Sequence, residues 1–278
     1  MPTDRHSGLA RERLVIHVSA TLLALLVLSP FLWLLVMSFK TNAEIFRFPP
    51  RLVFPPTLDN YAALWSSEFR GSFLNSLIVS TVSTLVSMAI GTPAAYALSR
   101  WTGRGGATIT LWILASRMAP PIAFTIPFFL AYRHAGLLDT HLGLIIVYLT
   151  FNLALVIWMM QPFFDGVPRE LEEAAWIDGC GVWQAFRVVT LPLAAPGLAA
   201  TAVICFILSW NDFFYALVLT RTNASTAPVA IVNFIQYTGW EWGRIAAAGT
   251  LVMLPVVVFS MLVRNYLVRG LMAGGTKE

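Results

Sequence analysis

The 278-residue sequence is poor in charge, since only 12% of its residues are Asp, Glu, Lys or Arg. An average soluble domain carries roughly twice that share. Lysine is the scarcest cation, present only as Lys40 and Lys277, and the arginines do not gather in one stretch. A protein that binds nucleic acid needs a clustered basic surface. The composition therefore excludes nucleic acid as a partner and indicates a lipid bilayer instead.

Cysteine and catalytic motifs are also scarce. Two cysteines, Cys180 and Cys205, cannot build a disulfide framework, and we expect both to be unpaired packing residues. The four histidines lack the spacing of metal ligands, so no metal site is predicted. A phosphate-binding Walker loop needs Gly-Lys-Ser/Thr, but Lys40 follows Phe39 and Lys277 follows Thr276. We expect no catalytic residue, no cofactor and no ATP hydrolysis in this chain.

Long apolar runs dominate the rest of the sequence. A helix needs about 20 apolar residues to cross a bilayer, and the runs lack the two-residue alternation of a barrel strand. The first run is far longer than the apolar part of a signal peptide, so we interpret it as an uncleaved anchor. The sequence thus predicts six transmembrane helices, near Leu14–Phe39, Phe73–Ser99, Ala107–Tyr132, Leu142–Phe164, Ala194–Leu219 and Ile245–Val263.

Prolines and polar residues interrupt these runs. A proline removes a backbone donor and bends a helix, and the six within the runs are Pro30, Pro93, Pro120, Pro121, Pro127 and Pro255. Two sites add polarity: Ser116-Arg117 in the third run and Trp210-Asn211-Asp212 in the fifth. Charges at membrane depth usually face a cavity or a partner. The alternative is that both sites lie at the membrane surface, where Arg117 extends to water.

One charged, glycine-broken segment stands out between the fourth and fifth runs. Its acidic residues are Asp165, Glu170, Glu172, Glu173 and Asp178. Pro168 suits a first helical position, carboxylates suit the first turn, and Gly179 is placed to end a helix. Val182, Phe186 and Val189 then predict the apolar face of a second short helix. Two short helices outside the membrane could dock on another protein or lie as a solvated loop on the membrane.

A signature within this segment is specific. Glu173-Ala174-Ala175, three residues, Gly179, nine residues and Val189-Thr190-Leu191-Pro192 resemble the signature of inner-membrane subunits of ABC importers. Val189 replaces the usual isoleucine, and Cys180 replaces a small residue such as alanine. The resemblance implies an all-α membrane protein with the six-helix type I ABC importer permease fold. It also implies a cytoplasmic coupling helix pair that docks on an ATPase through Glu173, Ala174, Ala175, Asp178, Gly179, Leu191 and Pro192.

Softer motifs point to a narrower group. The chain is similar to the carbohydrate-uptake permeases related to the second permease subunit of the maltose system. The motifs are Asp59-Asn60-Tyr61, Asn75-Ser76, Arg117-Met118-Ala119-Pro120-Pro121, Trp210-Asn211-Asp212-Phe213-Phe214, Trp242-Gly243-Arg244, Leu254-Pro255 and the tail Arg269–Lys277. We therefore expect a sugar or polyol substrate. A neutral polyhydroxylated solute is bound by hydrogen-bonding groups and aromatic faces. The candidate residues along its pathway are Arg117, Tyr148, Asn152, Trp210 and Asn211.

The resemblance also implies an organisation and a set of partners. Residues 1–13 would be a cytoplasmic N-terminus, and residues 14–278 the transmembrane domain, with a coupling loop at 165–193. Ten Lys and Arg residues fall on the side of both termini and the coupling loop, against seven on the other, which favours placing that side in the cytoplasm. The partners would be a homologous second permease, a cytoplasmic ABC ATPase dimer that binds ATP and Mg, and an extracytoplasmic solute-binding protein.

Two other classes compete with this interpretation. An ion-coupled secondary transporter would show an inverted repeat and intramembrane carboxylates, of which Asp212 is the single candidate. A membrane-embedded enzyme would need a nucleophile and base or a metal at membrane depth, and the sequence shows neither. An ABC importer permease for a non-carbohydrate solute is a third alternative.

Overall fold

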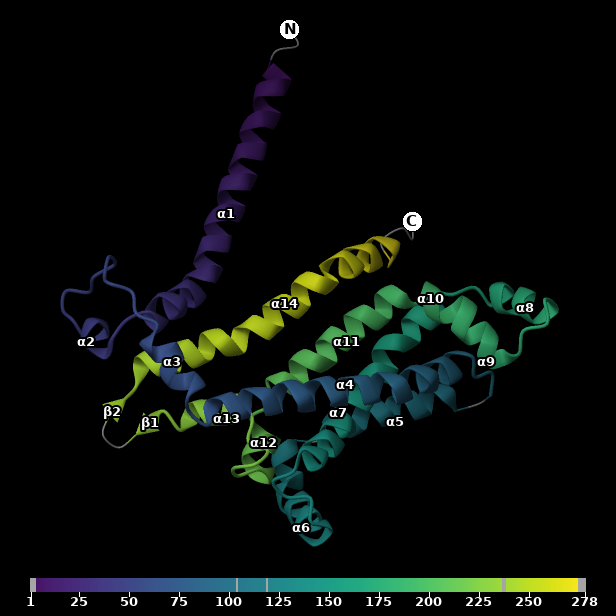
Figure 1. Ribbon diagram of the computed structural model, residues 1–278. Helices are drawn as coiled ribbons and strands as arrows, with labels where there is room; N and C mark the ends of the chain where they lie inside the picture. The colour runs from purple at the N-terminus through teal and green to yellow at the C-terminus, as the bar shows by residue number, and fades with distance from the viewer. Residues whose placement is uncertain (1–3, 104, 119, 237–238, 275–278) are drawn as a thin grey trace. The chain divides into compact units, whose positions relative to one another are not determined.

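The computed structural model describes residues 4–103, 105–118, 120–236 and 239–274, and the side chains among them outside 4–12, 235–240 and 263–274. Helices make up most of this part of the chain, joined by loops (Figure 1). The described residues also include a pair of two-residue antiparallel strands, β1 (Ile235–Gln236) and β2 (Gly239–Trp240). The predicted all-α fold is confirmed. Part of the tail motif, residues 275–277, lies outside the described residues.

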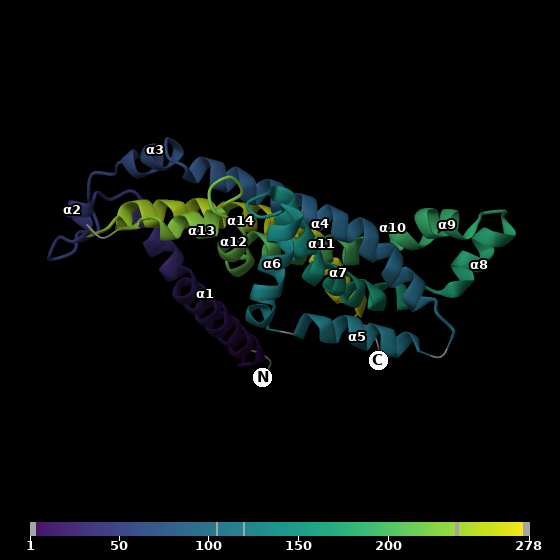
Figure 2. The ribbon, with the colours of Figure 1, turned by 90° about the horizontal axis from the view of Figure 1, so that it is seen from below.

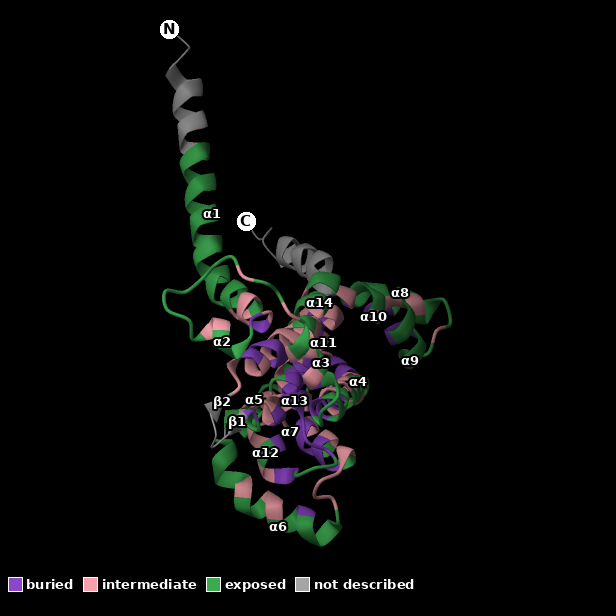
Figure 3. Ribbon diagram, turned by 60° about the vertical axis from the view of Figure 1, so that its left-hand side comes forward, coloured by how far each residue is buried: buried purple, intermediate pink, exposed green. Residues whose placement is uncertain are grey.

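The chain divides into two compact units, residues 1–67 with 233–251 and residues 68–232 with 252–278. The first contains α1, α2, α3, both strands and the start of α14. Its α1 is exposed along most of its described length (green in Figure 3), as expected of an apolar helix that lipid covers. The helices of this unit are α1 (Asp4–Ser38), α2 (Asn42–Ile45), α3 (Asp59–Trp65) and the first part of α14 (Trp242–Gly274).

Two of the sequence motifs close the end of α1. The Asn60 side-chain amide donates to the carbonyls of Ser38 and Lys40, both at 2.9 Å. Gly243 lies so close that a Cβ there would be 2.7 Å from Asn60 Oδ1. Asn60 thus satisfies backbone carbonyls that a helix end leaves free, and the absence of a side chain at Gly243 lets the start of α14 approach Asn60.

The second unit holds the remaining helices. They are α4 (Phe69–Ser99), α5 (Gly106–Met118), η1 (Pro121–Phe124), α6 (Thr125–Ala135), α7 (His141–Asp165), α8 (Arg169–Ile177), α9 (Val182–Ala185), the π-helix η2 (Phe186–Thr190), α10 (Leu191–Leu193), α11 (Ala195–Trp210), α12 (Phe214–Leu219), α13 (Ala227–Val232) and the rest of α14.

Helices α4, α7 and α11 pack against one another and form the core of this unit (Figures 1 and 2). Small residues let them approach closely, as in membrane proteins generally: a Cβ at Gly91 of α4 would lie 2.7 Å from Val156 of α7. The buried face of α4 is also rich in hydroxyls, at Ser72, Ser76, Ser80, Ser83, Thr84, Ser87 and Thr92.

The spans agree with the sequence in number but not all in shape. Four helical stretches are long and apolar enough to cross a membrane, residues 13–38, 69–99, 141–165 and 242–262, and two bent helix pairs bring the number to six. The first pair, 106–118 with 121–135, bends by 84°; the second, 182–193 with 195–210, bends by 78°.

Two of the predicted spans are interrupted in the structure and are not single continuous helices. The third, predicted over Ala107–Tyr132, is α5 followed by η1 and α6, because Pro120 and Pro121 cannot continue a helix. The fifth, predicted over Ala194–Leu219, ends at Trp210, and α12 begins at Phe214. There the Asp212 carboxylate accepts the Ala216 N–H at 3.1 Å, as a side chain does where a helix starts.

Candidate functional site

The coupling segment (residues 165–193) folds as a helix, a tight turn and a second helix. Helix α8 ends at Ile177, and Gly179 takes a left-handed φ of 91°. The Cys180 N–H donates to Ala175 O at 2.9 Å and the Gly179 N–H to Trp176 O at 3.0 Å. This pair of bonds is the Schellman motif, which favours glycine at the left-handed position. The predicted helix end at Gly179 is confirmed.

The outer side of this helix pair exposes apolar and acidic residues. Glu173, Ala174 and Asp178 are exposed, and Ala175 is half-buried. Around them lie large apolar side chains, among which Ile177 is 87% exposed. The others are Leu171, Trp176, Val182 and Trp183. Exposed apolar groups beside charges are typical of a protein interaction site.

The second helix differs from its predicted form. Val182 is exposed whereas Phe186 is buried, so the predicted face of Val182, Phe186 and Val189 is wrong. The π-helix η2 begins at Phe186 and changes the angular spacing of the side chains that follow it, up to Val189. Phe186 packs on Tyr96, with ring centroids 4.6 Å apart, while Leu191 and Pro192 continue into α10.

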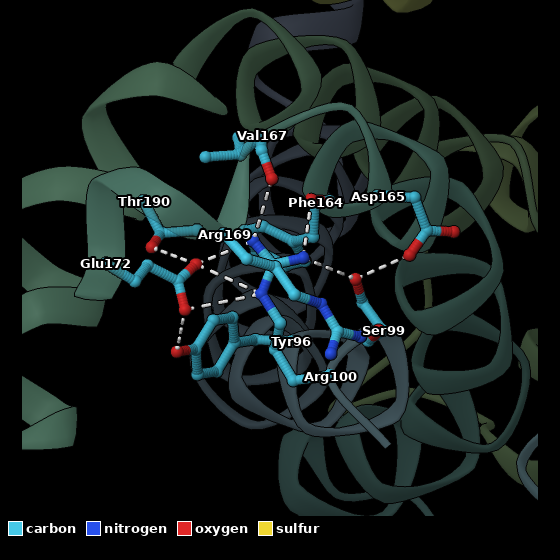
Figure 4. A network of polar contacts seen from close by, with 9 residues as sticks. All are labelled: Tyr96, Ser99, Arg100, Phe164, Asp165, Val167, Arg169, Glu172 and Thr190. Atoms are coloured by element: carbon cyan, nitrogen blue, oxygen red, sulfur yellow. Dashed lines mark hydrogen bonds and ion pairs between the residues drawn. The ribbon is translucent and has the colours of Figure 1, made fainter. Parts of the chain in front are cut away.

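A buried ion pair joins the coupling segment to the membrane helices (Figure 4). Glu172 is 2% exposed, and its Oε1 accepts Arg100 Nη2 at 2.6 Å and Nε at 3.0 Å. Tyr96 donates its hydroxyl to Oε2 and Thr190 donates its hydroxyl to Oε1, both at 2.8 Å. We call Tyr96, Arg100, Glu172 and Thr190 the Glu172 cluster; it draws on α4, α8 and η2.

The Arg100 guanidinium extends the cluster to the end of α7. It donates to Phe164 O at 3.0 Å and to Val167 O at 3.1 Å. Burial opposes ionisation of Glu172, but the hydrogen bonds from Arg100, Thr190 and Tyr96 together hold its pKa below the usual value. The carboxylate is therefore charged at neutral pH and fully bonded.

A second polar cluster holds the other ends of α4 and α7. Asp139, just before α7, has a left-handed φ of 56° and accepts the backbone N–H groups of residues 221–224 at 2.9–3.3 Å. Asn75 of α4 bonds His141 at 2.7 Å and donates to the carbonyls of Asn223 and Ser225. We call Asn75, Asp139, His141 and residues 221–225 the Asp139 cluster. Burial opposes ionisation of Asp139, but those four N–H groups lower its pKa to about 2.

A cavity of about 500 Å³ lies at the break between α5 and α6. Thr150 and Phe151, near the middle of α7, and Asp212 and Tyr215, after α11, form much of its wall. The Phe151 and Tyr215 rings are stacked, with centroids 6.3 Å apart. The remaining lining residues are Ser116, Arg117, Pro121, Phe124, Phe128 and Leu208. Aromatic faces with a few polar groups suit a polyhydroxylated solute.

The structure brings one of the predicted pathway residues, Arg117, to this cavity. Tyr148 is buried and donates to Asp212 at 2.9 Å, and Asn152 is buried and donates to Ser209 at 2.8 Å. Trp210 is buried and donates to Val252 O at 2.9 Å, while exposed Asn211 donates to Ile207 O within its own helix. Tyr148 thus lies directly behind Asp212 of the cavity wall, and Asn152 contacts Ser209, which is not among the lining residues.

Sequence reasoning missed the Glu172 cluster and most of the cavity wall. The sequence pattern places Glu172 with its acidic neighbours in a first helical turn, where carboxylates complement the helix dipole, and gives it no partner. A lone arginine directly after a long apolar run is the available signal, since such a cation needs a partner. No comparable sequence signal marks Thr150, Phe151 and Tyr215, which come together only in three dimensions.

Residues 87–272 match the family described as binding-protein-dependent transport system inner membrane component. The match covers the coupling segment, the cavity-lining helices and part of α14. The chain belongs to this family. It is therefore a permease subunit of a binding-protein-dependent transport system in the inner membrane, as the signature in the coupling segment predicted.

Relatives of this permease have assigned transport roles. It is 39% identical over 256 residues to the probable ABC transporter permease protein y4oR of Sinorhizobium fredii, covering 92% of each chain. It is 37% identical to the trehalose transport system permease protein SugB of Mycobacterium tuberculosis, covering 96% of this chain and 99% of SugB. Among solved structures, it resembles a bacterial ABC transporter involved in the import of the acidic polysaccharide alginate, with a TM-score of 0.75. That match has 26% identity and covers 96% of this chain and 98% of the other. The predicted ABC importer permease fold is confirmed.

Proposed function

We propose that this permease carries a sugar or polyol across the cytoplasmic membrane, driven by a separate ATPase subunit. The observation that carries the proposal is the coupling segment: a signature-bearing helix pair that exposes Glu173 and apolar side chains outward and is bonded inward to α4 and α7. The name of the trehalose permease SugB and the alginate importer fold support a carbohydrate.

The docking face is proposed to be the outer side of α8 and its turn. Glu173 supplies charge, Ala174 and Ala175 let a partner approach closely, and Gly179 sets the direction of the second helix. Asp178, Leu191 and Pro192 complete the proposed set by holding the turn and the return to the membrane. The occupant is a cytoplasmic ABC ATPase dimer that binds ATP and Mg, since this chain has no Walker loop.

The substrate pathway is proposed to pass the cavity at the break of the third span. Arg117 and Thr150 offer donors to hydroxyl groups, and Phe151 and Tyr215 offer rings. Tyr148 and Asn152 support this wall from behind, because they hold Asp212 and Ser209. Trp210 and Asn211 fix the end of α11, from which Asp212 follows.

The complete importer is proposed to contain a homologous second permease, the ATPase dimer and an extracytoplasmic solute-binding protein. Both termini and the coupling segment would face the cytoplasm, with residues 1–13 as a short N-terminus and 14–278 as the transmembrane domain. Because a binding protein selects the solute first, residues of this chain are expected to tune rate more than identity.

Uptake by a strain that lacks this permease tests the proposal. We expect the deletion to abolish ATP-dependent uptake of at least one labelled sugar or polyol, and the complemented strain to restore it. Arg117→Ala and Asn152→Leu should lower that uptake by about tenfold, equivalent to about 1.4 kcal/mol, while the ATPase still co-purifies. Arg133→Ala, which removes an exposed arginine at the end of α6, is the matched control and should transport normally.

Two results would contradict the proposal. Loss of amino acid, peptide or anion uptake with every sugar and polyol unaffected would reject the carbohydrate substrate. Uptake that persists without ATP and stops when ion gradients are collapsed would favour a secondary transporter instead.

A further inference from the structure

The coupling segment is fixed to the membrane helices by very few polar bonds. Among the described residues, the side-chain hydrogen bonds from α8 to α4 come from Glu172, apart from one long contact of 3.5 Å between Arg169 and Ser99 O. At the start of the segment, Ser99 also donates to Asp165 and Arg100 donates to Val167 O, and the remaining contact is apolar packing, chiefly of Phe186 on Tyr96 and Phe164. Apolar contacts alone permit sliding because they have no preferred direction.

The bonds of Glu172 resist sliding because they arrive from three sides. Arg100 holds the carboxylate through two nitrogens, Tyr96 holds the second oxygen, and Thr190 approaches from η2. The guanidinium is planar and rigid, which gives such pairs a fixed geometry that lysine does not reproduce. The same guanidinium donates to the carbonyl of Phe164 in the last turn of α7 and to that of Val167 just after it.

Because Glu172 is adjacent to Glu173, the inward-facing ion pair is connected directly to the outward-facing docking face. Successive helical residues differ by about 100° around the axis, so one carboxylate points into the protein while the next points out. A force applied to Glu173 on the outer face of α8 is thus passed to Arg100 through the adjacent residue, Glu172. Helix α7, which Arg100 also holds, carries Thr150 and Phe151 to the cavity wall.

We propose that Arg100 and Glu172 are positioning residues that make the coupling segment move as one rigid body with the inner ends of α4 and α7. The inference rests on the proposed function, since it assigns the ATPase as the source of the movement. It adds that transport requires this particular ion pair, and not only a docking face. Without this ion pair, the two helices of the coupling segment would tilt when the ATPase closes. The helices that line the cavity would then not move with them.

The test compares transport with ATP hydrolysis in the reconstituted importer, with Glu172→Gln, Arg100→Gln and the double variant. Each should still co-purify with the ATPase, because the outer face of α8 is unchanged. Solute transported per ATP hydrolysed should fall by about fivefold or more, the lower end of typical coupling between sites. Glu170→Gln, which removes the same charge from an exposed position of α8, should keep the wild-type ratio.

The double variant decides whether the two residues act together. If they form one link, the ratio in Arg100→Gln/Glu172→Gln should be no lower than in either single variant. If the loss in the double variant equals the product of the losses in the two single variants, the proposal is overturned. It is also overturned if the assembled variant complexes transport as much solute per ATP as the wild type, which is the result that a merely structural role predicts.

A distance measurement on the wild-type pair addresses the movement directly, whatever the solute. Spin labels at Thr102 and Gln184, both exposed, are placed in a complex that lacks Cys180 and Cys205. Their distance should stay constant when ATP is added, and should shift or broaden in Glu172→Gln. An ATP-dependent shift with the ion pair intact would overturn the rigid link. Absence of ATP-dependent uptake in the wild type would instead contradict the proposed function.

Discussion

The Glu172 cluster and the Asp139 cluster join the same two helices, α4 and α7, at opposite ends, but they use different chemistry. At the first, a carboxylate and a guanidinium meet in a buried site, where Glu172 is 2% and Arg100 15% exposed. At the second, a partly exposed carboxylate is held by backbone N–H groups of one loop. Backbone donors fix a loop to a helix end, whereas the ion pair links separate helices.

This difference has an energetic consequence. Breaking a buried ion pair leaves an uncompensated charge in a site of low polarity. Removing a carboxylate that bonds backbone N–H groups near water leaves donors that water can satisfy. The Glu172 cluster should therefore be the more sensitive of the two to substitution, and the Asp139 cluster the more tolerant.

The largest effect is expected from Arg100→Met, which leaves Glu172 buried without its cation. The free energy of unfolding should fall by roughly 3–5 kcal/mol, measured by denaturant titration of the purified permease in detergent. The double variant Arg100→Met/Glu172→Met should recover at least half of the loss, because it removes both charges. A loss below about 1 kcal/mol, the range of exposed pairs, would show that the two clusters do not differ.

An intermediate effect is expected from Asp139→Asn. Asparagine tolerates the left-handed φ, so the change removes charge without adding backbone strain. The free energy of unfolding at pH 7 should fall by on the order of 1 kcal/mol. The folded-state pKa of Asp139 is lowered to about 2, so its contribution is present above pH 4 and is lost as pH falls through about 2.

The difference between wild type and Asp139→Asn should accordingly begin to shrink near pH 4 and be largely lost only at about pH 1, below both the unfolded and the folded pKa. Glu68→Gln, at an exposed position before α4, is the control and should leave the pH profile of the wild type unchanged. A difference that is constant over this pH range would mean that the charge of Asp139 does not stabilise the fold.

The smallest effect is expected at the rim of the Glu172 cluster. Asp165 accepts the Ser99 hydroxyl at 2.5 Å, but both residues lie near the surface. Asp165→Asn should change the free energy of unfolding by less than about 0.5 kcal/mol, as at other exposed sites. A loss comparable to that of Arg100→Met would extend the sensitive region to the rim and weaken the contrast between burial and exposure.

Local sequence determined the elements of this protein. Apolar runs near α1, α4, α7 and α14 required spanning helices, because backbone groups in lipid must bond within their own segment. The coupling signature required a helix that ends at Gly179, and the left-handed φ of 91° there gives the reason. Family membership followed from the same few residues.

Only the tertiary structure decided which residues of each helix are buried in polar clusters and which face the cavity or a partner. Glu172 and Glu173 are chemically identical neighbours, and only the position of Arg100 makes one buried and leaves the other exposed. Likewise Tyr148 and Asn152 lie behind the cavity wall while Thr150 and Phe151 form it. Sequence fixes the 100° step between such neighbours, but the direction from which a partner helix packs is set by residues far along the chain.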